Sequence, residues 1–179
     1  MELFEKQLTS KQIFDGVVVK LFVDDIELPN GQKSIREVVR HPGAVCVIPV
    51  TDEGEVIMIK QFRYPFGRVL LEIPAGKLEP GEDPLDAVKR ELEEESGVVA
   101  ENVEFMGELY TTVAFTDEKI YTYIATGLTY KEAHPDADEF LEVEKIPLKA
   151  LVEMVMNGEI KDSKTQVAIL KAEKLLGNK

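Results

Sequence analysis

The chain has 179 residues, a length that suits one compact domain with a small additional subdomain. Its content of 44% hydrophobic and 31% charged residues is close to that of soluble globular proteins, which excludes a disordered chain or a disulfide scaffold. Because 34 Asp and Glu residues outnumber 21 Lys and Arg residues, the formal net charge is -13, which disfavours non-specific binding to the backbone of a nucleic acid.

The single cysteine, Cys46, lies in the apolar run 44–48. One cysteine cannot form an intramolecular disulfide, and a cysteine flanked by valines on a strand is expected to pack in the core rather than act as a nucleophile. The N-terminus has no basic segment followed by a long apolar one, and no apolar run of about 18 residues occurs. We therefore expect a soluble, cytoplasmic protein that is not exported.

The first forty residues are expected to form a small antiparallel β-meander. Residues 12–23 are rich in β-branched and aromatic side chains, and residues 34–40 form a second extended segment. Pro29-Asn30-Gly31 is a turn signal between them, and His41-Pro42-Gly43 then interrupts the pattern. Two domains follow from this boundary: residues 1–42 as an N-terminal β-strand subdomain and residues 43–179 as the main domain.

Beyond the boundary, strand-like and helical patterns alternate. The apolar runs 44–50 and 55–60 are joined by the turn-forming sequence Thr51-Asp52-Glu53-Gly54. Mixed strands around one central helix, with two further helices at the end, favour an α/β sandwich over a doubly wound nucleotide-binding fold, and no Gly-rich phosphate-binding loop is present. The other strands are expected at 69–73, 103–112, 119–126 and 140–146, and the helices at 83–96, 148–156 and 163–176.

The helix expected at 83–96 has recognisable signals at both ends. Asp83 is a good N-cap, and Pro84 occupies the first helical position, where its missing N–H costs nothing. Gly97 supplies the C-cap. The apolar face expected from the spacing consists of Leu85, Val88 and Leu92.

The same helix is expected to carry three carboxylates on one side, because Glu91 and Glu95 are four residues apart and Glu94 is three residues from Glu91. Like charges at this spacing repel one another, and a divalent cation would relieve the repulsion. Ligand sets made only of oxygen suit Mg²⁺ or Mn²⁺. The alternative is a solvated acidic helix face, which is the usual role of a run of glutamates.

Two further features favour a metal site over a solvated surface. Arg90 lies four residues before Glu94, so a partner for one carboxylate is built into the helix. The loop before the helix holds Gly76, Gly81 and Glu82 at fixed offsets, which a merely solvated helix would not need.

Residues 76–98 resemble the Nudix box, in which a Gly is followed after five residues by Glu and after seven more by Arg-Glu-apolar-x-Glu-Glu-x-Gly-apolar. The resemblance implies an α+β fold, a Nudix α/β/α sandwich of mixed sheet with a small N-terminal antiparallel subdomain. It also implies metal-dependent hydrolysis, with Mg²⁺ or Mn²⁺, of a nucleoside diphosphate linked to another moiety. The matching residues are Gly76, Glu82, Arg90, Glu91, Leu92, Glu94, Glu95, Gly97 and Val98.

Three flanking segments, 34–45, 60–65 and 72–76, resemble the ADP-ribose pyrophosphatase group of this family. In that group the N-terminal strands exchange across a homodimer, and the Arg of the Gln-Phe-Arg motif, here Arg63, contacts the substrate. An ordinary surface charge at the end of a strand is the alternative for Arg63. The resemblance thus implies a small nucleoside diphosphate substrate and a homodimer, and neither a nucleic acid nor a membrane is expected as a partner.

An acidic loop precedes Glu139, and it resembles the loop in which ADP-ribose pyrophosphatases keep a further catalytic or metal-binding Glu. Ala137 stands where relatives often have another acid, and His134 is the second candidate for the acid/base role. A loop that simply stays solvated is the alternative. The roles implied by the resemblance are catalytic for Glu139, Glu94 and Arg90; metal-binding for Ala75, Glu91, Glu94, Glu95 and Glu139; and substrate-binding for Arg36, Glu37, Arg63 and Glu82.

One segment departs from the pattern of the group. Members that favour ADP-ribose usually carry Pro-Gly in the loop where this chain has Val113 and Ala114, so the loop can follow a different path. Two alternatives to an ADP-ribose hydrolase therefore stay open. One is a non-catalytic nucleotide-sugar sensor that uses the same pocket, and the other is a Nudix hydrolase for a different dinucleotide.

Overall fold

The computed structural model describes residues 2–135 and 139–177. The chain divides into two compact units: Met1–Pro42 with Tyr110–Lys119, and Gly43–Leu109 with Ile120–Lys179. The division after Pro42 coincides with the boundary expected from the sequence. The sequence gives no sign, however, that residues 110–119 group with the N-terminal strands.

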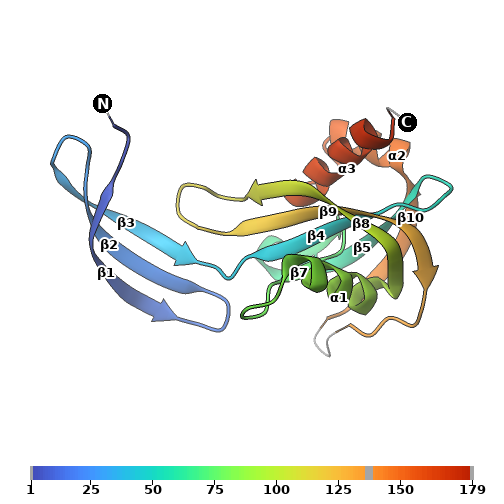
Figure 1. Cartoon of the computed structure of the whole chain (residues 1–179), viewed down its shortest axis with the longest axis horizontal. Coiled ribbons are helices and arrows are strands. Elements are labelled where there is room, and N and C mark those ends of the chain that lie inside the picture. The colour runs from blue at the N-terminus through green and yellow to red at the C-terminus, as the bar shows by residue number, and fades with distance from the viewer. Residues whose placement is uncertain (1, 136–138, 178–179) are drawn as a thin grey trace. The chain divides into compact units, whose positions relative to one another are not determined.

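The first unit contains an antiparallel sheet of three strands in the order β1-β2-β3 (Figure 1). The expectation of one extended strand over 12–23 is wrong, because the chain turns at residues 16–19. The Gly16 N–H donates to the Val19 carbonyl at 2.9 Å, and Lys20 pairs with Asp15 across the hairpin, so the local turn overrides the β-propensity of the valines. The strands are β1 (Lys6–Asp15), β2 (Lys20–Glu27) and β3 (Lys33–Arg40).

The second unit contains two sheets, which together confirm the mixed arrangement expected. In the four-stranded sheet β7-β4-β9-β8, β4 pairs parallel with β9 and antiparallel with β7. The three-stranded sheet β10-β5-β6 is antiparallel. The strands are β4 (Ala44–Pro49), β5 (Glu55–Arg63), β6 (Arg68–Glu72), β7 (Ala75–Lys77), β8 (Val98–Tyr110), β9 (Lys119–Tyr130) and β10 (Leu141–Pro147), and a short 3-10 turn, η1 (Tyr64–Phe66), joins β5 to β6.

The three expected helices are confirmed as α1 (Pro84–Ser96), α2 (Leu148–Met156) and α3 (Ser163–Leu176). On α1, Val88 and Leu92 are buried as expected, but Leu85 is exposed. Leu85 lies in the first turn, and the buried core contains Ala87 instead. No helix in the described part of the chain is long and apolar enough to cross a membrane.

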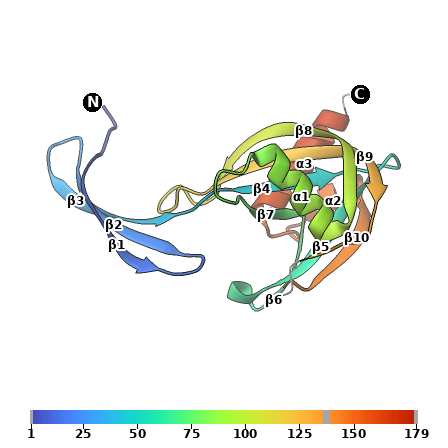
Figure 2. The ribbon, with the colours of Figure 1, turned by 60° about the horizontal axis from the view of Figure 1, so that its bottom comes forward.

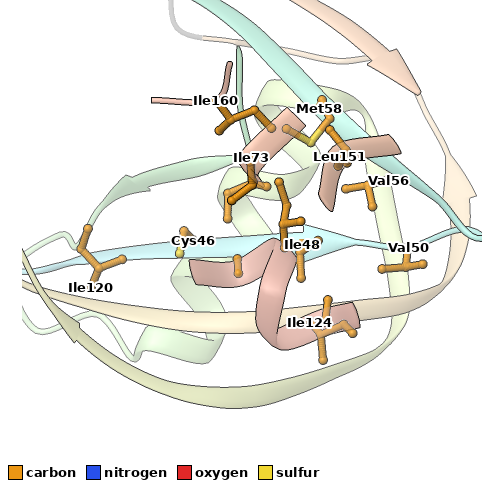
Figure 3. Close-up of a cluster of buried hydrophobic side chains, with 14 of the residues drawn as sticks. Cys46, Ile48, Val50, Val56, Met58, Ile73, Ile120, Ile124, Leu151 and Ile160 are labelled. Carbon is orange, nitrogen blue, oxygen red and sulfur yellow. The ribbon is translucent and has the colours of Figure 1, made fainter. Parts of the chain in front are cut away.

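Strand β4 is the centre of the core, because every one of its residues is buried. Cys46 and Ile48 point toward α2 and α3, where they pack with Met58, Ile73 and Leu151 (Figure 3). The alternating residues of β4 pack on the opposite face with α1, which lies across the strands in Figure 2. Helices therefore cover both faces of β4, which gives the α/β/α sandwich and explains why its sequence is continuously apolar.

Candidate active site

Helix α1 fixes the position of the carboxylates through its ends and its buried face. The Asp83 side chain accepts a hydrogen bond from the Leu85 N–H at 2.8 Å, and Gly97 ends the helix with a φ of 66°. Val88 and Leu92 pack against the sheet, which sets the rotation of the helix about its axis. Because the rotation is set, the side of α1 that carries the acidic residues faces the start of β7.

Arg90 joins three acidic side chains into one network. Its Nε and Nη2 donate to the Glu82 carboxylate at 2.9 and 3.0 Å. Its Nη1 donates to Glu91 and to Glu94, each at 2.9 Å. The expected pairing of Arg90 with Glu94 is confirmed, and the hydrogen bond with Glu82, followed by the charge of Glu91, raises the pKa of Arg90. The guanidinium stays charged and holds three carboxylates in place.

Glu95, the next acidic residue on this side of α1, is buried, with 5% of its surface exposed. Its Oε2 accepts a hydrogen bond from the Ala75 N–H at 3.0 Å. Burial raises the pKa of Glu95 to about 8, and the negative charges of Glu139 and Glu91 add to this rise, while the Ala75 N–H and Lys164 oppose it. The negative charge of the Glu95 carboxylate is therefore not balanced by the positive charge around it.

The negative charge of Glu91 is also incompletely balanced. Burial raises its pKa despite the opposing contribution of Arg90, and the charges of Glu94 and Glu139 act in the same direction as burial. Gly76 lies directly against it, because a Cβ added at Gly76 would overlap the Glu91 carboxyl group. The glycine of the motif is thus required by the close approach of the β7 backbone to the carboxylate.

This donor set fits a divalent cation. Within the described residues, no three His, Cys, Asp or Glu side chains already form a closed set of metal ligands, and Arg90 instead holds two of the carboxylates. The carboxylates of Glu91 and Glu95 are nevertheless partly buried, mutually repulsive and made only of oxygen donors. A hard divalent cation would relieve both the burial penalty and the repulsion.

The loop after β9 runs beside the C-terminal end of α1. The Lys131 N–H donates to the Gly97 carbonyl at 2.7 Å, and the His134 N–H donates to the Glu94 carbonyl at 3.0 Å. Glu139 lies close enough for its charge to raise the pKa values of both Glu91 and Glu95. The structure therefore brings Glu139 to the carboxylates, while Asp136, Ala137 and Asp138 lie outside the described residues.

Glu93 points away from this group and pairs with Lys131 at 2.8 Å. Glu93 therefore lies off the side of α1 that carries the other carboxylates. Glu93 is therefore a matched reference for the residues that face β7.

The expected substrate-binding residues are distributed over both units. Arg63 and Glu82 belong to the second unit with the carboxylates, and Arg63 forms a two-pronged ion pair with Glu72 at 2.7 and 2.8 Å. Arg36 and Glu37 lie on β3 of the first unit, where Arg36 pairs with Glu5 and Glu37 is exposed. Val113 and Ala114 also belong to the first unit and are exposed.

Four residues behind the site went unnoticed in the sequence. Glu72, which precedes Ala75 by three residues, also accepts a hydrogen bond from Lys164, and Thr165 accepts one from the Ile73 N–H at 3.0 Å. Asp162 caps α3 and accepts from Thr165. The only available signal was the capping sequence Asp162-Ser163-Lys164-Thr165, because a lysine in a first helical turn is almost always solvated.

Comparison with known proteins agrees with this geometry. The chain is 47% identical over 169 residues to an ADP-ribose pyrophosphatase of Bacillus subtilis (strain 168), covering 93% of this chain and 91% of the relative. It is 48% identical over 167 residues to a methanol dehydrogenase activator of Bacillus methanolicus, covering 92% and 90%. A crystal structure of an ADP compounds hydrolase superimposes with a TM-score of 0.87 at 22% identity, covering 97% of this chain and 95% of that one, so the fold is shared.

The model of the NUDIX domain matches residues 40–166, which include the whole Arg90 network and the buried Glu95. With that match and the two Bacillus relatives, the chain belongs to the NUDIX family.

Proposed function

We propose that this protein is a Mg²⁺- or Mn²⁺-dependent Nudix hydrolase that cleaves the pyrophosphate bond of ADP-ribose or a related nucleoside diphosphate sugar. The products are a nucleoside monophosphate and a sugar phosphate. The observation that carries the proposal is the cluster of Glu91, Glu94 and Glu95, organised by Arg90 beside the β7 backbone. The ADP-ribose pyrophosphatase of Bacillus subtilis supports this substrate class.

The pyrophosphate group resists attack because its negative oxygens repel a nucleophile. A divalent metal, when bound, would neutralise that charge and lower the pKa of a bound water. Glu91, Glu94, Glu95 and the Ala75 carbonyl are the proposed ligands. Arg90 holds the carboxylates of Glu91 and Glu94 in fixed positions before the substrate binds. Glu82 in turn fixes Arg90 through two hydrogen bonds. This pre-organisation avoids rearrangement of charges during the reaction.

Glu139 is the proposed acid/base residue. Its carboxylate can accept a proton from the attacking water and orient that water toward phosphorus. The hydrogen bonds of Lys131 and His134 to the end of α1 place the start of the loop beside the carboxylates.

The proposal also covers substrate contacts and assembly. Arg63 is proposed to bind the substrate with its guanidinium group while Glu72 holds that group in place. Arg36 and Glu37 stay proposed substrate-binding residues on the resemblance to the ADP-ribose pyrophosphatase group. A homodimer in the cytoplasm is part of the same proposal. The lone buried Cys46, which cannot form an intramolecular disulfide, is compatible with a reducing compartment.

The test is to incubate purified protein with Mg²⁺ and, separately, ADP-ribose, flavin adenine dinucleotide, NADH, diadenosine polyphosphates and GDP-mannose, and to identify the products by chromatography. We expect AMP and ribose phosphate from ADP-ribose and no products when the metal is chelated. If only a dinucleotide is turned over, the proposed substrate class is wrong, but the proposal of a hydrolase stands. Tight binding without turnover of any of these compounds would overturn the proposal.

A second candidate function is favoured by the 48% identity to the methanol dehydrogenase activator. In this reading the chain increases the rate of a dehydrogenase. Adding the protein to methanol dehydrogenase from Bacillus methanolicus tests it directly. Stimulation that survives loss of hydrolysis in the Glu95→Gln variant would favour a role independent of catalysis, such as the nucleotide-sugar sensor. If Glu95→Gln loses both hydrolysis and stimulation, activation of the dehydrogenase depends on hydrolysis.

A further inference from the structure

Every residue of the segment from Glu72 to Ala75 is held by hydrogen bonds to other elements of the fold. Glu72 accepts hydrogen bonds from Arg63 on β5 and from Lys164 on α3. The Ile73 N–H donates to the Thr165 hydroxyl at 3.0 Å, and the Pro74 carbonyl accepts from Val47 at 3.0 Å. The final residue, Ala75, donates its N–H to Glu95.

The two contacts from α3 are made by buried side chains. Thr165 has no exposed surface, and the Lys164 side chain is 11% exposed. Lys164 also lies 3.1 Å from Asp162, the residue that caps α3, and the charges of Asp162 and Glu72 raise the pKa of Lys164 although burial opposes them. A charged lysine is therefore fixed between two carboxylates, at the end of the helix that contacts the segment.

A lysine and a threonine at this place do more than fill space. An apolar residue would pack in the same volume, whereas these two give α3 directional hydrogen bonds to two consecutive residues of the segment. The geometry of the hydrogen bond from Ala75 to Glu95 thus depends on the N-terminal end of α3.

We propose that Lys164 and Thr165 are positioning residues for the hydrolase reaction, which fix residues 72–75 and, through Ala75, the carboxylate of Glu95. The inference rests on the proposed function, in which Glu95 and the Ala75 carbonyl are metal ligands. Groups that orient metal ligands from behind affect metal affinity and rate by about 10- to 100-fold in known sites. We expect the effect of Lys164 and Thr165 on metal affinity and rate to lie in that range.

The first test replaces Thr165 by Val, which keeps the shape and removes the hydroxyl, with Thr165→Ser as the variant that restores it. Amide hydrogen exchange, measured by NMR without metal or substrate, reads the Ala75 N–H directly. We expect exchange of Ala75 to become at least about tenfold faster in Thr165→Val and to return to the native rate in Thr165→Ser. The Val50 N–H, which donates to Ala125 at 2.8 Å, is the internal reference and should not change.

Calorimetric titration with Mn²⁺ alone gives the second readout. The affinity for Mn²⁺ should fall by about tenfold in Thr165→Val and in Lys164→Met, and Lys164→Arg should recover most of it. In the hydrolysis assay of Thr165→Val, kcat should fall more than KM changes, because the Thr165 hydroxyl contacts Ile73 and not Arg63, the proposed substrate contact. Lys161→Met, an exposed lysine three residues before Lys164, should match the native protein in every measurement.

These outcomes separate positioning from a purely structural role. Native exchange of Ala75 and native Mn²⁺ affinity in Thr165→Val would overturn the inference, and so would an equal acceleration at Ala75 and Val50, which signals only lower global stability. If Lys164→Met fails to fold, the comparison of Thr165→Val with Thr165→Ser still tests the inference. Because the exchange experiment uses no substrate, its result stands even if hydrolysis of ADP-ribose is not observed.

Discussion

Arg90 uses every nitrogen of its guanidinium group to hold acidic neighbours, since Nε, Nη1 and Nη2 all donate hydrogen bonds. Glu95, four residues after Glu91, is treated differently by the fold: it is buried, receives one backbone N–H and faces like charges. Arg90 stabilises the network without a metal, whereas Glu95 would gain a compensating charge from the cation of the proposed function. This division separates residues that organise the site from residues that would bind the metal.

Replacing Glu139 by Gln tests the proposed acid/base residue. The amide keeps the size of the side chain but cannot take a proton from water, so we expect kcat to fall by about 100-fold with little change in KM. Steady-state kinetics with the substrate found in the panel measure both constants. His134→Ala should retain most of the native rate, because His134 contacts α1 through its backbone N–H. Loss of turnover in His134→Ala with most of it kept in Glu139→Gln would reverse the assignment.

Glu72 gives a prediction on acid stability. Burial by itself raises its pKa, but the hydrogen bonds and charges of Arg63 and Lys164 outweigh it and lower the pKa below the ordinary value of 4.5. A carboxyl group with a lowered pKa in the folded state stabilises the fold above its unfolded pKa, and this contribution is lost as the pH falls. We expect the free energy of unfolding, measured with denaturant, to decline below pH 4.5 with a shallower decline in Glu72→Gln. Parallel pH profiles would contradict this ion-pair account.

At the scale of elements, the ends of α1 follow directly from the sequence because each cap is a local interaction. Asp83, Pro84 and Gly97 act within one turn of their own positions, and the Nudix motif adds the carboxylate side. Two features could not be predicted because they depend on distant partners. Residues 110–119 join the N-terminal strands, and Lys164 is buried where Glu72 lies opposite. The turn at 16–19 is local, but the β-propensity of the valines in it obscured the signal.

The N-cap of α1 can be tested by mutation. Asp83→Ala removes the acceptor of the Leu85 N–H, which should lower the free energy of unfolding by about 1 kcal/mol. Asp83→Asn keeps an acceptor oxygen and should remain close to the native stability. Thermal unfolding followed by circular dichroism compares the three proteins. Equal melting temperatures for the Ala and Asn variants would show that the cap contributes little.

At the scale of the whole molecule, the N-terminal unit has a small core of its own. Among its described residues, Ile26 is the only hydrophobic side chain that is buried, and every residue of β1 is exposed. A short isolated meander is marginally stable in water, so association with a second copy would bury this surface. We expect multi-angle light scattering to give twice the chain mass of 20.1 kDa. A particle of 20.1 kDa in dilute solution would rule out the dimer.

The most direct test of the central claim compares Glu95→Gln with Glu93→Gln, two identical changes made two residues apart on α1. Glu95 faces the Ala75 backbone with the other carboxylates, whereas Glu93 pairs with Lys131 away from them. The assay measures the rate of ADP-ribose hydrolysis over a range of Mg²⁺ concentrations. In Glu95→Gln the rate should fall by about 100-fold or more, and more Mg²⁺ should be required. In Glu93→Gln the rate should stay near that of the native protein. Equal activity of the two variants would contradict the proposed metal site.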